Sequence, residues 1–218
     1  MLSATWTGLL PNSWAELFND LDLDSVLSNV EDPDTVTTCP SRDHVFRCFS
    51  YFDVLETKVV ICGQDPYHTP GVANGLAFDA VCKRIPPSLR NIFKEVKRTY
   101  PDSECNIEEW AKQGVLMFNR SMTVEANKPN SHVSYWKPIT NRMIQRMNDY
   151  WKEHGRRIVF LLWGNNAKEM IEFIDVTHHT VLSHTHPSPL SRKPFVGNDH
   201  FKLCNDYLEQ RGSDKIRW

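Results

Sequence analysis

The sequence lacks the features that mark membrane and secreted proteins. No apolar run approaches the roughly 18 residues that a transmembrane helix requires. The first 14 residues hold neither the basic nor the apolar segment of a secretory signal, and no arginine-rich transit peptide is present. We therefore expect an intracellular protein, neither secreted nor membrane-bound. The nucleus, including a host nucleus for a viral protein, is the favoured compartment, and the cytoplasm is expected for a bacterial protein.

Paired cysteines are also missing. The 6 cysteines are scattered and form no Cys-X-X-Cys pair, which argues against a disulfide framework or a zinc ribbon and favours reduced thiols. His178, His179, His184 and His186 fall close together, but they include no helical i, i+4 pair and no neighbouring carboxylate pattern. We expect no metal and no cofactor, with His178 and His179 as surface or capping residues.

Strong net charge is absent as well, at −2 overall. Residues 1–60 carry 3 Lys and Arg against 10 Asp and Glu, so the rest of the chain is net basic. This imbalance is compatible with a polyanionic partner for the basic part, although charged stretches are more often solvated faces.

Four short apolar runs, at 58–62, 115–118, 158–163 and 180–183, are typical of buried strands. Helical patterns alternate with them, so we expect an α/β fold: one domain over 1–218, with a central four-stranded, twisted parallel sheet and helices on both faces. The expected helices cover 12–30, 43–52, a segment beginning at Ser88, 107–113, 136–154, 166–174 and 199–210. Asn12 or Ser13 is the expected cap of the first, and Ser88 of the third.

A polar cluster follows each of the four strands. These clusters are 64–68, Asn119, Gly164 with Asn165, and 184–191. Because ligands of parallel sheets bind at the carboxyl ends of the strands, we expect one pocket there. It should contain a carboxylate, one or two imidazoles, an amide and an aromatic ring.

The motifs at these strand ends resemble those of the family 1 uracil-DNA glycosylases. They are Gly-Gln-Asp-Pro-Tyr-His at 63–68, Leu-Met-Phe-Asn at 116–119, Leu-Leu-Trp-Gly at 161–164 and His-Pro-Ser-Pro-Leu-Ser at 186–191. Their order and approximate spacing also match, and the resemblance runs from about residue 14 to residue 218.

The resemblance implies how the pocket works on uracil in single- or double-stranded DNA. Asp65 would stabilise a cationic sugar and orient or activate water, while a neutral His186 would donate to the departing base. Asn119 would pair with the polar edge of uracil, which cytosine reverses. The remaining pocket residues would be Tyr67, which excludes a thymine methyl, Phe78, which stacks on the base, and Gln64, which acts mainly through its backbone.

The same resemblance implies a DNA-binding surface around the pocket, because a base must leave the duplex before it can react. Leu190 would enter the gap in the base stack. The residues implied in backbone contacts are His68, Ser88, Gly164, Asn165, Ser188, Arg192 and Lys193. Inhibitor proteins that mimic uracil or DNA are further implied partners of a protein that we expect to be a monomer.

The chain departs from the family pattern after two motifs. Asn165 stands where the family usually has Ser, which can alter the fit to a phosphate. Residues 192–197 stand in place of an Arg followed by a Gly-Phe-Phe-Gly turn, which leaves open whether Arg192 or Lys193 supports Leu190.

Three other functions remain to be weighed against uracil excision. A metal-dependent hydrolase would lose activity to a chelator. A DNA-binding adaptor without catalysis is disfavoured by Asp65, Asn119 and His186. A glycosylase for another damaged base is disfavoured by Tyr67 together with Asn119.

Overall fold

The four expected strands form one parallel sheet. The computed structural model describes residues 9–30 and 37–218. The first eight residues, on which the expectation of no secretory signal partly depends, lie outside this range. The strand order is β3-β2-β5-β6, and all three pairings are parallel. The strands are β2 (Val59–Gly63), β3 (Val115–Asn119), β5 (Val159–Trp163) and β6 (Thr180–His184).

Burial of the strands explains why their sequences are continuous apolar runs. Every residue of β2, β3 and β5 is buried, whereas β6 lies at the edge and is only partly covered. Side chains of a strand alternate between the faces of a sheet. Phe160 therefore packs on Trp151 on one side, and Trp163 packs on Phe201 on the other.

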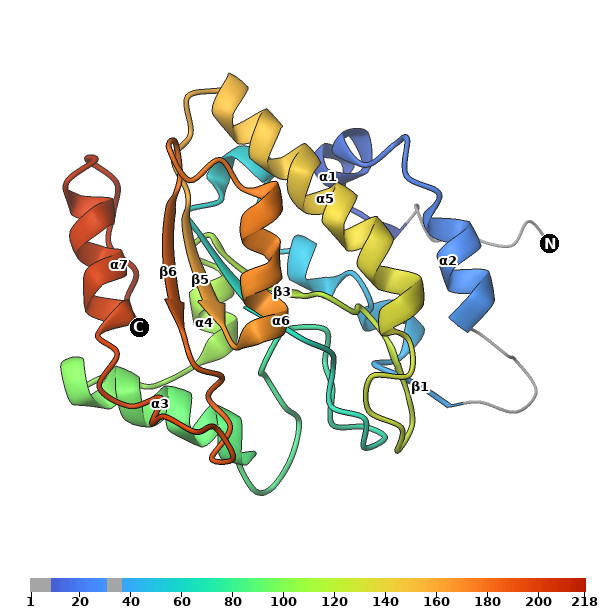
Figure 1. The fold of residues 1–218 in the computed structure, drawn as a ribbon, viewed down its shortest axis with the longest axis horizontal. Helices are drawn as coiled ribbons and strands as arrows, with labels where there is room; N and C mark the ends of the chain where they lie inside the picture. The colour runs from blue at the N-terminus through green and yellow to red at the C-terminus, as the bar shows by residue number, and fades with distance from the viewer. Residues whose placement is uncertain (1–8, 31–36) are drawn as a thin grey trace.

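Helices cover both faces, which confirms the expected layers (Figure 1). On one face lie α3 (Pro87–Thr99), α4 (Ile107–Ala111) and α7 (His200–Glu209). On the other lie α5 (Val133–Glu153) and α6 (Asn165–Lys168), with α2 (Leu23–Val30) packed against α5 and α1 (Asn12–Leu17) on the same side. A second, two-stranded sheet pairs β1 (Thr38–Cys39) with β4 (Val124–Glu125), and the sequence pattern did not predict it.

Several expected helices are shorter than the periodicity predicted. The first is divided, because the chain turns between α1 and α2. Short 3₁₀ turns at Arg42–His44 and Arg47–Phe49 replace a helix over 43–52, and α6 continues only as a 3₁₀ turn, Glu169–Phe173. A further 3₁₀ turn covers Val54–Glu56. An apolar period alone does not distinguish these tighter turns from an α-helix.

The expected caps, Asn12 or Ser13 for the first helix and Ser88 for the third, are wrong. Pro11 occupies the cap position of α1, and the Ser13 hydroxyl inside that helix donates to the Asp53 carboxylate at 2.8 Å. Pro86 is the cap residue of α3 and Pro87 its first helical residue, so Ser88 lies within the first turn. A proline suits the first helical position because it brings no N–H that would need a partner.

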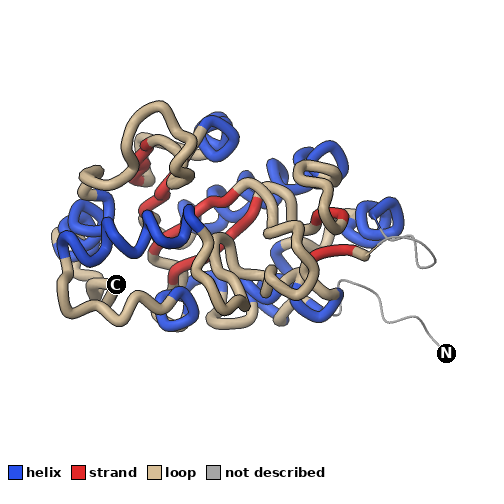
Figure 2. Tube along the Cα trace, turned by 90° about the horizontal axis from the view of Figure 1, so that it is seen from below, coloured by secondary structure: helices blue, strands red, loops and turns tan. Residues whose placement is uncertain are grey.

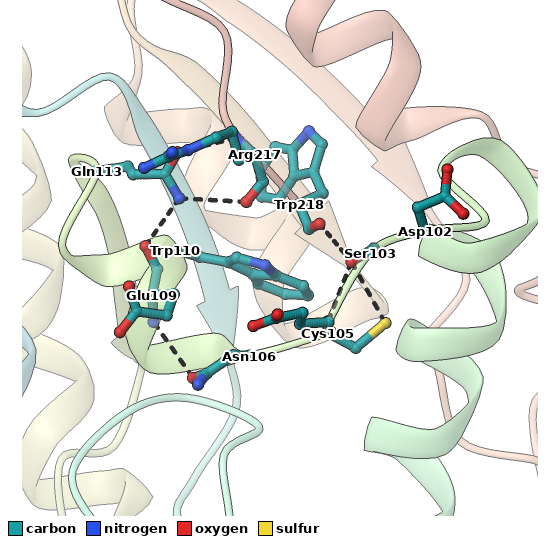
Figure 3. Close-up of a pocket in the computed structure, with 10 residues that line it drawn as sticks. Asp102, Ser103, Cys105, Asn106, Glu109, Trp110, Gln113, Arg217 and Trp218 are labelled. Atoms are coloured by element: carbon teal, nitrogen blue, oxygen red, sulfur yellow. Dashed lines mark hydrogen bonds between the residues drawn. The ribbon is translucent and has the colours of Figure 1, made fainter.

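Near the C-terminus, Ile216 and Trp218 are buried on the α4 side of the sheet. The indole of Trp218 lies against Trp110, with ring centroids 5.3 Å apart, and the Trp218 backbone oxygen accepts a hydrogen bond from Ser103 (Figure 3). A hollow of about 400 Å³ lies here, lined also by Gln113 and Arg217. It shares no residue with the pocket at the strand ends.

The carboxyl ends of the strands lie at the bottom of Figure 1, and Figure 2 views the molecule from that end. Loops gather around the strands there. In the described ranges, no helix combines the length and the apolar character that crossing a bilayer requires.

Candidate active site at the carboxyl ends of the strands

The loops after β2, β3 and β6 meet in one pocket of about 230 Å³. This volume lies below the roughly 300 Å³ at which pockets for drug-sized ligands begin, so it suits a group as small as one base. The predicted residues that line it are Gln64, Asp65, Tyr67, His68, Phe78, Ser88, Asn119 and His186. The expected convergence of a carboxylate, one or two imidazoles, an amide and an aromatic ring is thus confirmed for the clusters that follow β2, β3 and β6.

Asp65 is held by a residue that the sequence did not reveal. Its Oδ2 accepts a hydrogen bond from the backbone N–H of Asn130 at 2.9 Å. Asn130 has a φ of 65°, a left-handed conformation that asparagine tolerates better than most residues. Burial raises the pKa of Asp65, although the Asn130 N–H and the nearby His68 act in the opposite direction. The carboxylate is therefore oriented but poorly solvated.

The side chain of Gln64 bonds to neighbouring amides, and the role of its backbone toward a base stays a prediction. Its Nε2 donates to Asn130 Oδ1, and its Oε1 accepts from Asn166 Nδ2. Asn130 in turn holds Asp65. These amides connect the start of α6 to the carboxylate, and no sequence pattern indicated Asn130 or Asn166.

His186 is a neutral imidazole with its proton on Nε2. The backbone N–H of Ser188 donates to Nδ1 at 3.0 Å, so Nδ1 must be the unprotonated nitrogen. Burial also lowers the pKa of His186, which favours the uncharged ring. The Ser191 hydroxyl donates to the backbone oxygen of His186 at 2.7 Å and fixes the turn. Nε2–H is left available to donate to a ligand.

Asn119 presents an unpaired acceptor. The residue is 6% exposed, and its Oδ1 is buried without a hydrogen-bond partner. A buried acceptor without a donor is costly, so a ligand with an N–H group would satisfy it. The neighbouring Gly63 makes room for this amide, because a Cβ there would lie 2.2 Å from Oδ1.

Phe78 and Tyr67 form the aromatic part of the pocket. The Tyr67 hydroxyl donates to the Phe78 backbone oxygen at 3.1 Å. Phe78 has a φ of 66°, unusual for a bulky residue, and such strain persists where surrounding structure enforces it. Its ring centroid lies 5.9 Å from that of His186. A flat ligand between Phe78, Asn119 and His186 would be stacked and hydrogen-bonded together.

Of the predicted DNA-contact residues, His68 and Ser88 line the pocket itself, and the others do not. Gly164 and Asn165 line a neighbouring hollow that includes Gln64 and His186, rather than the main pocket. Leu190 is 92% exposed, and its backbone N–H donates to Ser188 Oγ at 3.2 Å. Arg192 and Lys193 are exposed beyond it. The structure thus places an apolar tip and two cations on one loop.

Two histidines of the C-terminal cluster, His178 and His179, lie within hydrogen-bonding distance of backbone groups of the protein. Of the two expected roles, surface or capping, His179 has the capping one: it is buried, and its Nδ1 accepts from the Ile158 backbone N–H at 3.1 Å, just before β5. His178 lies against the Arg156 backbone oxygen at 3.0 Å. Within residues 9–30 and 37–218, no three His, Cys, Asp or Glu side chains gather into a group suited to a metal ion.

Gly164 is expected to be required for the position of His186. An added Cβ would lie 3.0 Å from the Cβ of His186, and the φ of +91° is strained for other residues. We expect Gly164→Ala to lower activity about tenfold by displacing the imidazole. Gly155→Ala is the matched control, because it has a φ of +66° but open space around the added atom. Equal activity of the two variants, measured beside their Tm values, would contradict this explanation.

Comparisons with known proteins agree with this arrangement. Residues 49–209 match the model of the uracil DNA glycosylase superfamily. A uracil-DNA glycosylase of Dichelobacter nodosus is 45% identical over 190 residues, covering 84% of this chain and 81% of the relative. One of Escherichia coli K12 is 44% identical with the same coverage.

Solved structures share the fold. Mimivirus uracil-DNA glycosylase superposes with a TM-score of 0.85 over 98% of this chain and 89% of its own, at 22% identity. A protein of Nitratifractor salsuginis gives a TM-score of 0.61 over 84% and 85%, at 19% identity.

Proposed function

The chain belongs to the uracil DNA glycosylase superfamily and releases uracil from DNA in base excision repair, and we propose that Asp65 and His186 carry the reaction. The enzyme hydrolyses the N-glycosidic bond and leaves an abasic site. The unpaired, buried Oδ1 of Asn119 beside the neutral donor of His186 carries the assignment of this pocket. Together they offer an acceptor and a donor to the edge of one base.

The proposed reaction proceeds through charge separation. The bond between C1′ and the uracil nitrogen breaks, and its electron pair leaves with the base as an anion. His186 Nε2–H donates to the uracil oxygen that gains charge, and the Asp65 carboxylate lies against the cationic sugar. Water then adds to C1′ and passes its proton to Asp65, so atoms and charge balance. The Asn130 N–H supports this step by fixing the Asp65 carboxylate.

Base selection is assigned to Asn119 and Tyr67. The Asn119 amide accepts from N3–H and donates to O4 of uracil, whereas cytosine presents the reverse pattern and would leave buried groups unpaired. Tyr67, held by its hydroxyl against Phe78, occupies the space of a thymine methyl. Phe78 stacks on the base.

We assign DNA binding to the residues around the pocket. Leu190 enters the gap left by the extruded base, and the cations Arg192 and Lys193 lie close to the sugar-phosphate backbone of the DNA. The residues proposed to hold phosphates are His68, Ser88, Gly164, Asn165 and Ser188.

We further propose one catalytic domain over 1–218 and a nuclear location, or the cytoplasm for a bacterial source. The six free thiols support a reducing compartment.

An inhibitor protein is a further proposed partner. A variant of the mimivirus protein forms a complex with UGI in a solved structure. We propose that UGI also binds this chain and that it covers the strand-end pocket.

A direct assay tests the proposed function. The protein is incubated in EDTA with a single-stranded oligonucleotide that contains one uracil, and abasic sites are measured. We expect complete conversion, with none in the same oligonucleotide carrying thymine or cytosine. Absence of abasic sites would contradict the function, and sensitivity to the chelator would favour a metal-dependent hydrolase.

Tyr67→Ala is expected to let the enzyme release thymine. Removing the ring opens space for the 5-methyl group, whereas Tyr67→Phe keeps the ring and loses only the hydrogen bond to Phe78. We expect thymine release from a thymine-containing oligonucleotide by the Ala variant alone. Release by both variants, or by neither, would show that the ring does not exclude the methyl group.

A further inference from the structure

The loop between β6 and α7 carries His186 near its start and Leu190 at its tip. It lies alongside α3 in Figure 1, and hydrogen bonds from this helix hold the loop at two points. The α3 residues concerned are Asn91 and Glu95. With Ser88, which lines the pocket, they recur at i, i+3 and i+7 and so share one face of the helix.

Asn91 fixes the start of the loop. Its Nδ2 donates to the Pro187 backbone oxygen at 2.8 Å, one residue after His186. The Ser191 hydroxyl closes the turn onto the His186 backbone oxygen. The hydrogen bonds that fix the start of the loop therefore also fix the backbone of His186.

Glu95 fixes the far end of the loop. Its carboxylate is fully buried, and it accepts from the backbone N–H groups of Gly197 at 2.5 Å and Asp199 at 2.8 Å. Arg98 donates to both of its oxygens, at 3.0 and 2.9 Å, and also pairs with Asp199. A carboxylate is rarely buried in this way unless its charge is neutralised and its oxygens are satisfied.

These contacts account for both carboxylate oxygens of Glu95, whereas Leu190 has one hydrogen bond, from its backbone N–H to Ser188 Oγ within the same loop. Leu190 is 92% exposed, so its position depends on how firmly the two ends of the loop are held. Inserting a side chain into a base stack costs free energy, because neighbouring bases must unstack. A loop that is already ordered before binding loses less conformational entropy when its side chain enters the base stack.

We propose that Glu95 is a positioning residue for base extrusion, which acts by anchoring the far end of the loop that carries Leu190. The proposal rests on the proposed function, in which Leu190 enters the duplex. It goes beyond that function because Glu95 touches neither base, sugar nor phosphate. Its contribution should appear with duplex DNA and be absent with a single strand, whose base needs no extrusion from a pair.

The test compares single-turnover rates of uracil release from duplex and single-stranded oligonucleotides. We expect Glu95→Gln to lower the duplex rate about tenfold while the single-strand rate changes less than about threefold. The change replaces one acceptor oxygen by an NH₂ group, which cannot accept from the loop or from Arg98. Arg98→Gln, at a side chain 40% exposed, is the milder variant and should shift the ratio of rates in the same direction.

Asn205→Ala is the control for stability alone. Asn205 is buried in α7. Its amide is hydrogen-bonded to the Tyr100 hydroxyl and to the backbone N–H and C=O of Ile216, none of which belongs to the loop. It should lower Tm and leave the ratio of duplex to single-strand rates unchanged. If Glu95→Gln and Arg98→Gln also leave this ratio unchanged, the proposal is overturned.

Leu190→Ala separates the proposal from the function beneath it. We expect it to lower the duplex rate selectively. If it does and the Glu95 variant does not, only the anchoring role fails. If Leu190→Ala spares the duplex rate, the assignment of Leu190 fails, and the role of Glu95 with it.

Discussion

Replacing Asp65 with asparagine is expected to lower the rate of uracil release by roughly 10²- to 10⁴-fold, the range typical of a lost acid–base group. The amide keeps the size of the side chain and can still accept from the Asn130 N–H. It has no negative charge to stabilise a cationic sugar and no basic oxygen to take a proton from water. The loss should therefore fall on the chemical step and not on binding.

Single-turnover kinetics with saturating enzyme measure this loss directly. Binding of a uracil-containing oligonucleotide, measured in parallel by fluorescence anisotropy, should be retained by Asp65→Asn. Uracil release at the unaltered rate would refute the assignment of Asp65. Loss of binding together with rate would make Asp65 a binding residue instead.

Replacing His186 with leucine is expected to lower the rate by roughly 10²- to 10³-fold, the usual cost of removing one donor to a developing anion. Leucine fills the space beside Phe78 and Gly164 but cannot donate to the base. His178→Leu is the matched control, because it also replaces an imidazole by leucine, at a ring that is hydrogen-bonded to the Arg156 backbone oxygen and does not line the pocket. Equal rates for the two variants would show that His186 is not the donor.

The same assignment predicts how the wild-type rate depends on pH. The reaction requires Asp65 ionised and His186 neutral, and both forms prevail above the pKa of each group. Burial raises the pKa of Asp65 above 3.8 and lowers that of His186 below 6.5. The rate of the chemical step should therefore fall as the solution is acidified below pH 6.5. A rate that rises on acidification through pH 6.5 would indicate a protonated His186 acting as an acid.

The sheet was predictable because its signal is local. Val59–Gly63, Val115–Asn119 and Val159–Trp163 are buried on both faces, so each reads as an unbroken apolar run. The helix limits were less accessible, since the turn between α1 and α2 and the 3₁₀ turns keep apolar residues at spacings that also suit an α-helix.

The site was predictable where its residues directly follow strands. Asp65, Asn119 and His186 could be placed at one rim from parallel topology alone. Asn130 could not, because it lies 65 residues from Asp65 in a turn and acts through its backbone N–H. Glu95 was hidden for another reason: a glutamate between lysines on a helix is typical of a solvated face, and only the fold brings Gly197 and Asp199 to it.

A crystal structure of the Asp65→Asn variant with a uracil-containing duplex tests the central claim most directly. We predict that the uracil lies outside the base stack, over Phe78, with its N3–H on Asn119 Oδ1 and a carbonyl oxygen within hydrogen-bonding distance of His186 Nε2. A uracil that remains stacked in the duplex, or binds away from these three residues, would contradict the account.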